Sequence, residues 1–146
     1  KELLKVDPDY KLYIAGTLKE ELMNYDLDHV FLESDAIKVL GKITKNEIIE
    51  HLRDSFCVFY PQHVHPETFG LIYIEANCVG TPVLAHSFGA TDEVIGNSEQ
   101  LVDATSSEAV VNKILDWQQN GRPDVGCLEK FQLENVVKKW KETLGL

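Results

Sequence analysis

Two carboxylates flank a glycine near the middle of the chain, and their spacing suggests a site for a phosphorylated ligand. Glu67 lies in a predicted loop and Glu75 in the predicted helix that follows, with Gly70 at the junction. The amides of Phe69, Gly70 and Leu71 at the helix start have no partners within the helix and lie at the positive end of its dipole. Such a helix start binds phosphate, and Gly70 lets the phosphate come close to the backbone.

Neither carboxylate would tolerate the phosphate itself, so both are expected to accept hydrogen bonds from hydroxyl groups. A rise of about 1.5 Å per residue puts Glu75 roughly 6–9 Å beyond the helix start. A ligand with hydroxyls at both ends and a diphosphate in the middle fits this spacing, which describes a nucleotide sugar. A lone buried charge is costly, so Glu75 must also have a partner or face a cavity. The alternative is that Glu67 is a surface loop residue and Glu75 a paired acid of the core.

The helix that positions these groups is predicted to begin after Thr68 and to end before Gly80. Thr68 is a favoured N-cap residue, and its hydroxyl is expected to bond the amide of Leu71. Gly80, followed by Thr81-Pro82, is typical of a helix end. The residues between are almost all apolar, which predicts a buried helix.

Short apolar runs alternate with amphipathic segments along the chain, and this alternation predicts an α/β fold with an open parallel sheet flanked by helices. Strands are predicted at residues 10–15, 36–40, 56–60, 82–86 and 100–103. Helices are predicted from about Lys19 within residues 18–32, after a Thr44–Glu47 capping box, after Ser106 or Ser107, and over the stripe Val136, Val137, Trp140 and Leu144.

Four loops follow strand ends and are expected to share one rim of the sheet, where ligands of such folds bind. They contain Gly16-Thr17, Gly41-Lys42-Ile43, residues 61–67 and residues 87–90. The alternative for Gly16 and Gly41 is that they are turn glycines with no contact to a ligand.

The stretch from Glu67 to Ile95 resembles the donor-binding half of retaining glycosyltransferases of the GT-B fold, most closely the family 4 group. Glu67 and Glu75 match the E-x7-E motif of that family. The matching residues around them are Phe69-Gly70-Leu71, Ala76, Gly80-Thr81-Pro82-Val83, Gly89 and Glu93-Val94-Ile95. The usual Gly-Gly after the strand at 82–86 reads Gly89-Ala90 here, which leaves the first glycine in place.

The resemblance implies a role for each matching residue. Glu67 would bind the donor sugar, the backbone at Thr68 and the amides of Phe69 to Leu71 would bind sugar and phosphate, and Glu75 would hold the ribose. The loops at Gly16-Thr17 and Gly41-Lys42-Ile43 would contact the nucleotide base. The donor would be UDP- or GDP-linked, with no separate cofactor and no tightly held metal.

The resemblance also implies an architecture larger than this chain. Residues 1–146 would be a single Rossmann-like C-terminal domain, the donor-binding half of a two-domain GT-B enzyme of glycan biosynthesis. The acceptor, a saccharide or a lipid-linked sugar, would bind an N-terminal domain that precedes Lys1. An Arg and a Lys that neutralise the diphosphate would also lie just upstream of Lys1. This piece alone is expected to bind donor weakly and to transfer nothing, and the last helix would expose part of its apolar stripe.

Charge and cysteine content narrow the range of partners. Fourteen basic against 24 acidic residues give a net charge of −10, the wrong sign for a nucleic-acid binder or for a domain resting on an anionic membrane.

The three cysteines lack metal-ligand spacing, and Cys57 and Cys78 fall in apolar elements, which predicts reduced core residues. Reduced cysteines and the absence of a membrane-length apolar run favour a cytoplasmic protein.

Three histidines lie in or near the loops of the expected rim. His63 and His65 form an H-x-H pair with His86 on the expected rim, which indicates either a metal site or a polar lip on the donor pocket. The Asp92-Glu93 pair suggests either acid/base chemistry or, as favoured here, that Glu93 caps or orients the loop after Gly89. A nucleotide-sugar epimerase of the same fold and a non-catalytic nucleotide-binding module are the other functions considered.

Overall fold

The computed structural model describes residues 1–25 and 32–146, so the end of the helix predicted within residues 18–32 lies outside the described residues. The chain divides into two compact units, residues 1–50 and residues 51–146. We describe each unit by itself.

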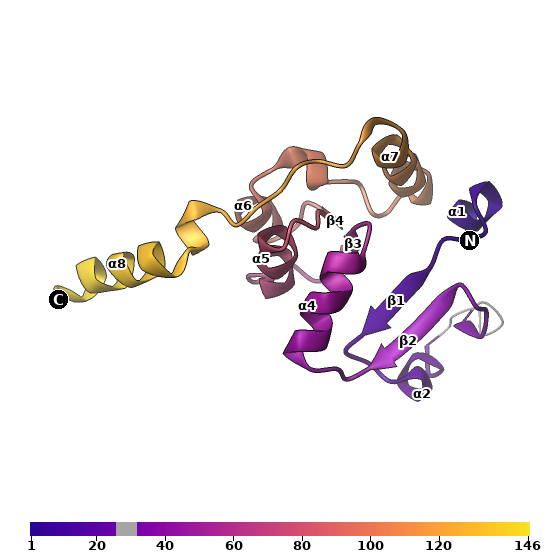
Figure 1. The fold of residues 1–146 in the computed structure, drawn as a ribbon, viewed down its shortest axis with the longest axis horizontal. Helices are drawn as coiled ribbons and strands as arrows, with labels where there is room; N and C mark the ends of the chain where they lie inside the picture. The colour runs from indigo at the N-terminus through magenta and orange to yellow at the C-terminus, as the bar shows by residue number, and fades with distance from the viewer. Residues whose placement is uncertain (26–31) are drawn as a thin grey trace. The chain divides into compact units, whose positions relative to one another are not determined.

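The first unit contains a parallel pair of strands. Its elements, shown from indigo to magenta in Figure 1, are α1 (Glu2–Val6), β1 (Leu12–Ala15), α2 (Lys19–Leu22) and β2 (Ile37–Gly41). The strands pair from Leu12 opposite Ile37 to Ile14 opposite Val39, with an irregularity before Ala15. Helix α4 (Lys45–Asp54) follows and crosses into the second unit. Its start confirms the predicted capping box, because the backbone amide of Thr44 donates to Glu47 Oε2 at 2.7 Å.

The second unit contains the other parallel pair of strands and most of the helices. Its elements are β3 (Val58–Tyr60), α5 (Leu71–Cys78), β4 (Val83–Ala85), α6 (Thr91–Ile95), α7 (Ser107–Asn120) and α8 (Leu133–Leu144), with short 3₁₀ helices η1 (Ser98–Gln100) and η2 (Glu129–Phe131). Val58 lies opposite Val83 and Tyr60 opposite Ala85, so the two strands end at the same edge. The fold class predicted from the sequence, α/β with parallel strands flanked by helices, is confirmed.

Two predictions about the edges of these elements need correction. Residues 100–103 form no full strand, because only Leu101 pairs, in an isolated bridge with Ala85. Helix α5 is not buried on every side, since Leu71 is 64% exposed while Tyr73 is 1% exposed. An apolar composition predicts burial only where a neighbour covers each face of the helix. The elements that pack closely on α5 are α6 and β4.

Local signals for helix ends agree well with the structure. Ser106 caps α7, accepting a hydrogen bond from the amide of Ala109 at 3.1 Å. At the end of α5 the amide of Gly80 donates to Asn77 and the amide of Thr81 to Ala76. This pair of bonds is the Schellman arrangement, so the predicted end before Gly80 is confirmed.

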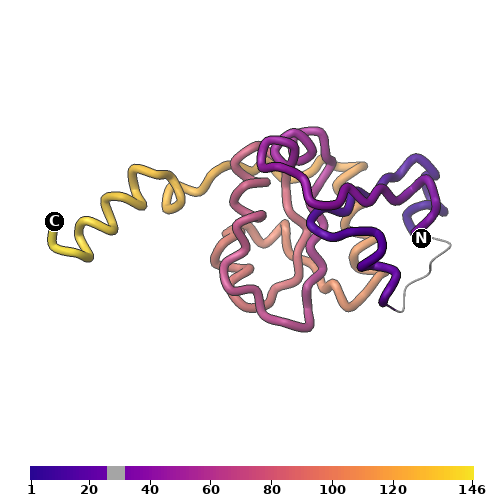
Figure 2. Tube along the Cα trace, turned by 90° about the horizontal axis from the view of Figure 1, so that it is seen from below, coloured from indigo at the N-terminus to yellow at the C-terminus, as the bar shows by residue number. Residues whose placement is uncertain are grey.

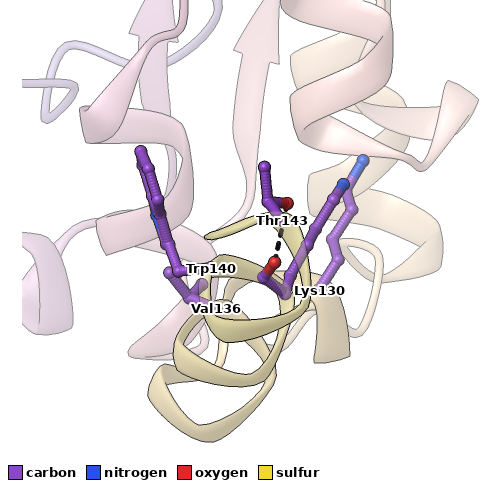
Figure 3. A pocket seen from close by; sticks show the side chains of 5 residues that line it. Lys130, Val136, Trp140 and Thr143 are labelled. Atoms are coloured by element: carbon purple, nitrogen blue, oxygen red, sulfur yellow. Dashed lines mark hydrogen bonds between the residues drawn. The ribbon is translucent and has the colours of Figure 1, made fainter. Parts of the chain in front are cut away.

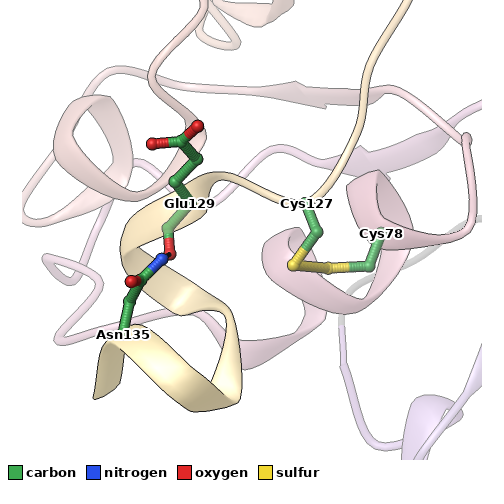
Figure 4. Close-up of a disulfide and its surroundings, with 4 residues drawn as sticks. All are labelled: Cys78, Cys127, Glu129 and Asn135. Atoms are coloured by element: carbon green, nitrogen blue, oxygen red, sulfur yellow. Dashed lines mark hydrogen bonds between the residues drawn. A yellow bond between two sulfur atoms is a disulfide. The ribbon is translucent and has the colours of Figure 1, made fainter. Parts of the chain in front are cut away.

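A disulfide joins Cys78, at the end of α5, to Cys127, in the extended segment after α7 (Figure 4). The prediction that Cys78 is a reduced core residue is therefore wrong. It failed because pairing depends on where the chain brings Cys127 back, 49 residues later, and no local pattern encodes that return. Cys57 is the free cysteine, and burial raises the pKa of its thiol to about 11 against the opposing effect of Arg122.

Helix α8 is the last, yellow segment of the chain in Figures 1 and 2. It has no buried residue, and Trp140 and Leu144 of its apolar stripe are each 60% exposed. The prediction that part of this stripe is exposed is confirmed. In the described part of the chain, no helix has the length and apolarity needed to cross a membrane.

The disulfide makes a direct prediction about thiol counts. Unfolded in denaturant without reductant, the protein should show one thiol per chain by Ellman titration, and three after reduction. In the folded protein Cys57 should react slowly at pH 8, because its thiol stays protonated. Three thiols in denaturant before reduction would show that the Cys78–Cys127 bond is absent.

Candidate functional site

The backbone of Glu67 is fixed at the edge where β3 and β4 end. Glu67 forms an isolated parallel bridge with Gly89, and the amide of Ala90 donates to the carbonyl of Glu67 at 2.8 Å. Two of the loops predicted to share a rim, residues 61–67 and residues 87–90, are thereby joined. This part of the predicted rim is confirmed.

Gly89 allows the two loop backbones to meet because a residue with a side chain would not fit at this position. Its φ is +68°, a conformation that side chains rarely adopt. A Cβ at Gly89 would lie 2.7 Å from the amide nitrogen of Glu67, and it would also collide with the carbonyl oxygen of Glu67. The backbones of the two loops touch only because this position is a glycine.

The carboxylate of Glu67 binds two different kinds of donor. Its Oε2 accepts a hydrogen bond from the hydroxyl of Tyr60 at 3.0 Å. Its Oε1 accepts from the amide of Thr68 at 2.9 Å and from the amide of Phe69 at 3.3 Å. The side chain therefore spans the gap between the end of β3 and the segment that leads into α5.

These bonds shift the ionisation of both partners. Partial burial by itself would raise the pKa of Glu67, but the amide of Phe69, the Tyr60 hydroxyl and the amides of Thr68 and Gly70 together hold it below its usual range. Burial, and then the bond to the Glu67 carboxylate, raise the pKa of Tyr60 to about 12. At neutral pH the pair is a carboxylate facing a protonated phenol.

The start of α5 differs from the prediction. Gly70 is the N-cap, in the left-handed region with φ 75°, and no side chain caps the helix, so the prediction that Thr68 is the N-cap is wrong. The physical reason is that the neighbouring carboxylate of Glu67 takes the amides of Thr68 and Phe69 and holds the chain away from a threonine cap. The amide of Leu71 belongs to the first helical turn and has no partner within the helix.

Glu75 lies one turn further along α5 and is half-buried rather than buried. It has an interaction partner within the chain, as the cost of burying a lone carboxylate requires. The structure keeps Glu67 and Glu75 in the same unit, one before and one within α5.

The remaining predicted site residues lie in the first unit. Gly16 follows the last residue of β1, and Gly41 is the last residue of β2. The amide of Gly16 donates to the carbonyl of Gly41 at 2.8 Å, so their loops share an edge. The hydroxyl of Thr17 donates to Glu21 at 2.8 Å, which engages it within the loop. Lys42 is exposed and Ile43 half-buried. Their predicted contact with a nucleotide base stays a prediction.

Two histidines of the expected rim, His63 and His86, lie close to each other. The rings of His63 and His86 lie 6.1 Å apart, edge to face, and His86 accepts a hydrogen bond from the amide of Ala104 at 3.1 Å. Within residues 1–25 and 32–146, no group of three or more histidine, cysteine or acidic side chains is placed to hold a metal ion.

Three contacts near the site were not apparent from the sequence. The hydroxyl of Ser87 donates to Asp92 at 2.7 Å, so Asp92, rather than the predicted Glu93, bonds the loop around Gly89. The ring of Phe69 meets Phe131 of η2 edge to face at 5.8 Å. The third contact is the hydrogen bond from the hydroxyl of Tyr60 to Glu67. The sequence does single out Tyr60, because it is the one hydroxyl in the apolar run of residues 56–60.

The two hollows described in the structure lie elsewhere. One, of about 320 Å³, is lined by Lys130 and α8 residues that include Val136 and Trp140 (Figure 3). The other, of about 560 Å³, lies in the first unit along β2. Neither of these two hollows is lined by Glu67 or Glu75.

Comparisons with known proteins agree with the resemblance seen in the sequence. A family profile described as "Glycosyl transferases group 1" matches residues 1–130. A glycogen synthase of Mycobacterium tuberculosis (strain CDC 1551 / Oshkosh) is 28% identical over 121 residues, covering 78% of this chain and 28% of the relative. A sucrose synthase of Denitrovibrio acetiphilus is 31% identical over 105 residues, covering 70% of this chain and 13% of the relative. The chain thus spans less than a third of the length of either relative.

Substituting Gly89 should separate the two loops. Gly89→Ala is expected to lower the free energy of unfolding by roughly 2–3 kcal/mol, because alanine is strained at this φ and its Cβ displaces the Glu67 backbone. Urea unfolding measures the change. Gly126→Ala is the matched control, because a Cβ there meets nothing within 4 Å. Equal losses in both variants would contradict the close approach.

The lowered pKa of Glu67 predicts how stability depends on pH. Its stabilising contribution should be complete above the ordinary glutamate pKa of about 4.3 and should be lost as the pH falls through the lower folded value. The stability gap between wild type and Glu67→Gln should therefore narrow from pH 7 to pH 3 in urea unfolding. Glu99→Gln, an exposed glutamate in η1, should show no comparable narrowing. A constant gap for Glu67→Gln would contradict the shift.

Proposed function

This chain belongs to the group 1 glycosyl transferases, and from that premise we propose that residues 1–146 are the donor-binding domain of a retaining glycosyltransferase. The whole protein would transfer a sugar from a nucleotide diphosphate sugar, linked to UDP or GDP, onto an acceptor hydroxyl. The acceptor, a saccharide or a lipid-linked sugar, would bind an N-terminal domain outside this chain.

One observation supports this proposal above the others: the segment entering α5 already binds an anion, the chain's own Glu67 carboxylate. The amides of Thr68 and Phe69 donate to it at 2.9 and 3.3 Å. A phosphate oxygen needs the same kind of donors, and neighbouring backbone amides in the segment before a helix can supply them without a positively charged side chain. This suits a domain with a net charge of −10, since the phosphate would be bound locally rather than by the overall field.

Each carboxylate would then have a separate task. Glu67, held at the edge of the parallel pair, would accept hydrogen bonds from hydroxyls of the donor sugar. The amides of Phe69, Gly70 and Leu71 would bind the leaving phosphate, and Glu75 on α5 would accept hydrogen bonds from the ribose. The glycine loops at Gly16 and Gly41 would contact the base.

In the proposed reaction the acceptor oxygen bonds to the anomeric carbon of the donor sugar. The bond from that carbon to the phosphate oxygen breaks, its electron pair stays on the diphosphate, and the acceptor proton moves to a phosphate oxygen on the same face. Such a step needs no protein nucleophile. The residues named above would contribute by holding the sugar in place and by stabilising the negative charge that grows on the leaving group.

The cytoplasmic location predicted from the cysteines stays a prediction. The disulfide counts against it, because the argument assumed that Cys78 is reduced. Disulfides persist chiefly in oxidising compartments, and Cys78 and Cys127 form one. A thiol count on protein trapped with iodoacetamide in its native cells would decide between the two redox states.

Donor binding tests the proposal directly. In the full-length protein, UDP-glucose or GDP-glucose at a hundredfold over its dissociation constant should stabilise the fold by about 2.7 kcal/mol in a thermal-shift titration. Glu75→Ala should weaken binding of the nucleotide about tenfold, because a hydrogen bond to a charged group is lost. Glu99→Ala, on exposed η1, is the matched control and should bind like wild type.

The possible outcomes separate the functions considered. Absence of any shift with either nucleotide would show that the donor proposal is wrong. Sugar isomerisation without an acceptor would identify an epimerase, and binding with neither transfer nor isomerisation would identify a non-catalytic module. Wild-type affinity in Glu75→Ala would remove Glu75 from the site.

A further inference from the structure

The two oxygens of the Glu67 carboxylate have separate partners on separate elements. Oε1 is bound by amides of the segment leading into α5, and Oε2 is bound by the hydroxyl of Tyr60. One oxygen can therefore change partners while the other keeps its bond.

Donor binding, in the function proposed above, would require such a change. A phosphate at the start of α5 needs the amide of Phe69, which Glu67 now occupies. A carboxylate and a phosphate repel each other and cannot share one donor hydrogen, so Oε1 must give up the amide of Phe69. The hydroxyl of Tyr60 on Oε2 and the amide of Thr68 on Oε1 are then the bonds that hold the side chain of Glu67 in place.

We propose that Tyr60 is a positioning residue for sugar recognition: its hydroxyl retains the Glu67 carboxylate when the donor diphosphate takes the amide of Phe69, so that the oxygen released from that amide can accept a bond from a sugar hydroxyl. This inference rests on the proposed function and assigns Tyr60 a role that acts through Glu67. It places no contact between Tyr60 and the donor itself.

The surroundings of Tyr60 suit an anchor that stays still while its partner moves. Tyr60 is the last residue of β3 and pairs with Ala85 of β4, so its backbone belongs to the sheet rather than to the loop. Its ring meets the ring of Tyr73 edge to face, with centroids 5.2 Å apart. Tyr73 is 1% exposed, so the ring that contacts Tyr60 is itself buried. The hydroxyl is therefore presented by a packed aromatic pair.

The charge state also suits the task. With its pKa raised to about 12, Tyr60 remains a proton donor at every pH at which the protein would work. Glu67, with its pKa lowered, remains an acceptor. The bond between them holds the carboxylate without neutralising it, so the free oxygen keeps its capacity to accept a bond from a sugar hydroxyl.

The test compares the affinity for a nucleotide with and without its sugar. Isothermal titration of the full-length protein with UDP, UDP-glucose, GDP and GDP-glucose gives the gain in affinity that the sugar supplies. Tyr60→Phe should reduce that gain about tenfold while leaving the affinity for the nucleotide alone within about twofold, because the amides stay available.

Two further variants separate positioning from general loosening of the structure. Tyr73→Phe removes a hydroxyl from the same aromatic pair and should lower the melting temperature while keeping the sugar-dependent gain. In a Glu67→Ala background, Tyr60→Phe should have no further effect on the gain, because the residue it positions is absent.

The outcomes for this inference and for the proposed function are distinct. A sugar-dependent gain in wild type that survives Tyr60→Phe would overturn the positioning role and leave the proposed function intact. Equal loss in Tyr60→Phe and Tyr73→Phe, or additive losses in the Glu67→Ala background, would also overturn it. Wild-type protein that binds none of the four ligands would overturn the proposed function, and the inference with it.

Discussion

The candidate site depends on one contact, the close approach of the Glu67 and Gly89 backbones. Each lies in a loop that follows a strand of the same parallel pair, and the bridge between them brings the two loops to one edge. A side chain at Gly89 would push them apart. Parallel strands make this possible because their carboxyl ends fall on the same side, so two loops distant in sequence become neighbours.

Once that contact is made, the position of the Glu67 side chain follows from hydrogen bonding. The end of β3 offers the Tyr60 hydroxyl and the segment before α5 offers amides that the helix cannot satisfy. A carboxylate between them satisfies both sets and lowers its own pKa. The same arrangement stabilises the fold and, in the proposed function, would form the recognition element, so structural and functional roles would coincide at Glu67.

Patterns within a few residues were enough to predict part of this arrangement. The Thr44–Glu47 box, the Ser106 cap and the end before Gly80 were all predicted, because each depends on bonds between residues that are close in sequence. The order of the first four strands and the helices between them was also predicted, since apolar runs and caps mark it. Glu67 and Glu75 are site candidates because of their spacing around a glycine, again a local signal, and their roles stay a prediction.

What failed depends on where distant segments meet. The Cys78–Cys127 disulfide needs the chain to return after α7, and the exposed face of α5 needs knowledge of its neighbours. Thr68 failed for a subtler reason. A threonine is a good cap in isolation, but the carboxylate one residue earlier is held by Tyr60 and binds the amides of Thr68 and Phe69, and the helix begins only after Gly70.

This competition sets a condition on any anionic ligand at the start of α5. The ligand must displace a carboxylate that is covalently tethered and already in place, so part of its binding energy is spent on breaking bonds that stabilise the free protein. A diphosphate meets this condition better than a single carboxylate, because it has more charge and more acceptor oxygens. A weakly charged ligand would leave Glu67 on the amides. In the proposed function, the internal carboxylate would therefore favour a diphosphate over smaller anions before any contact with the base or the sugar is made.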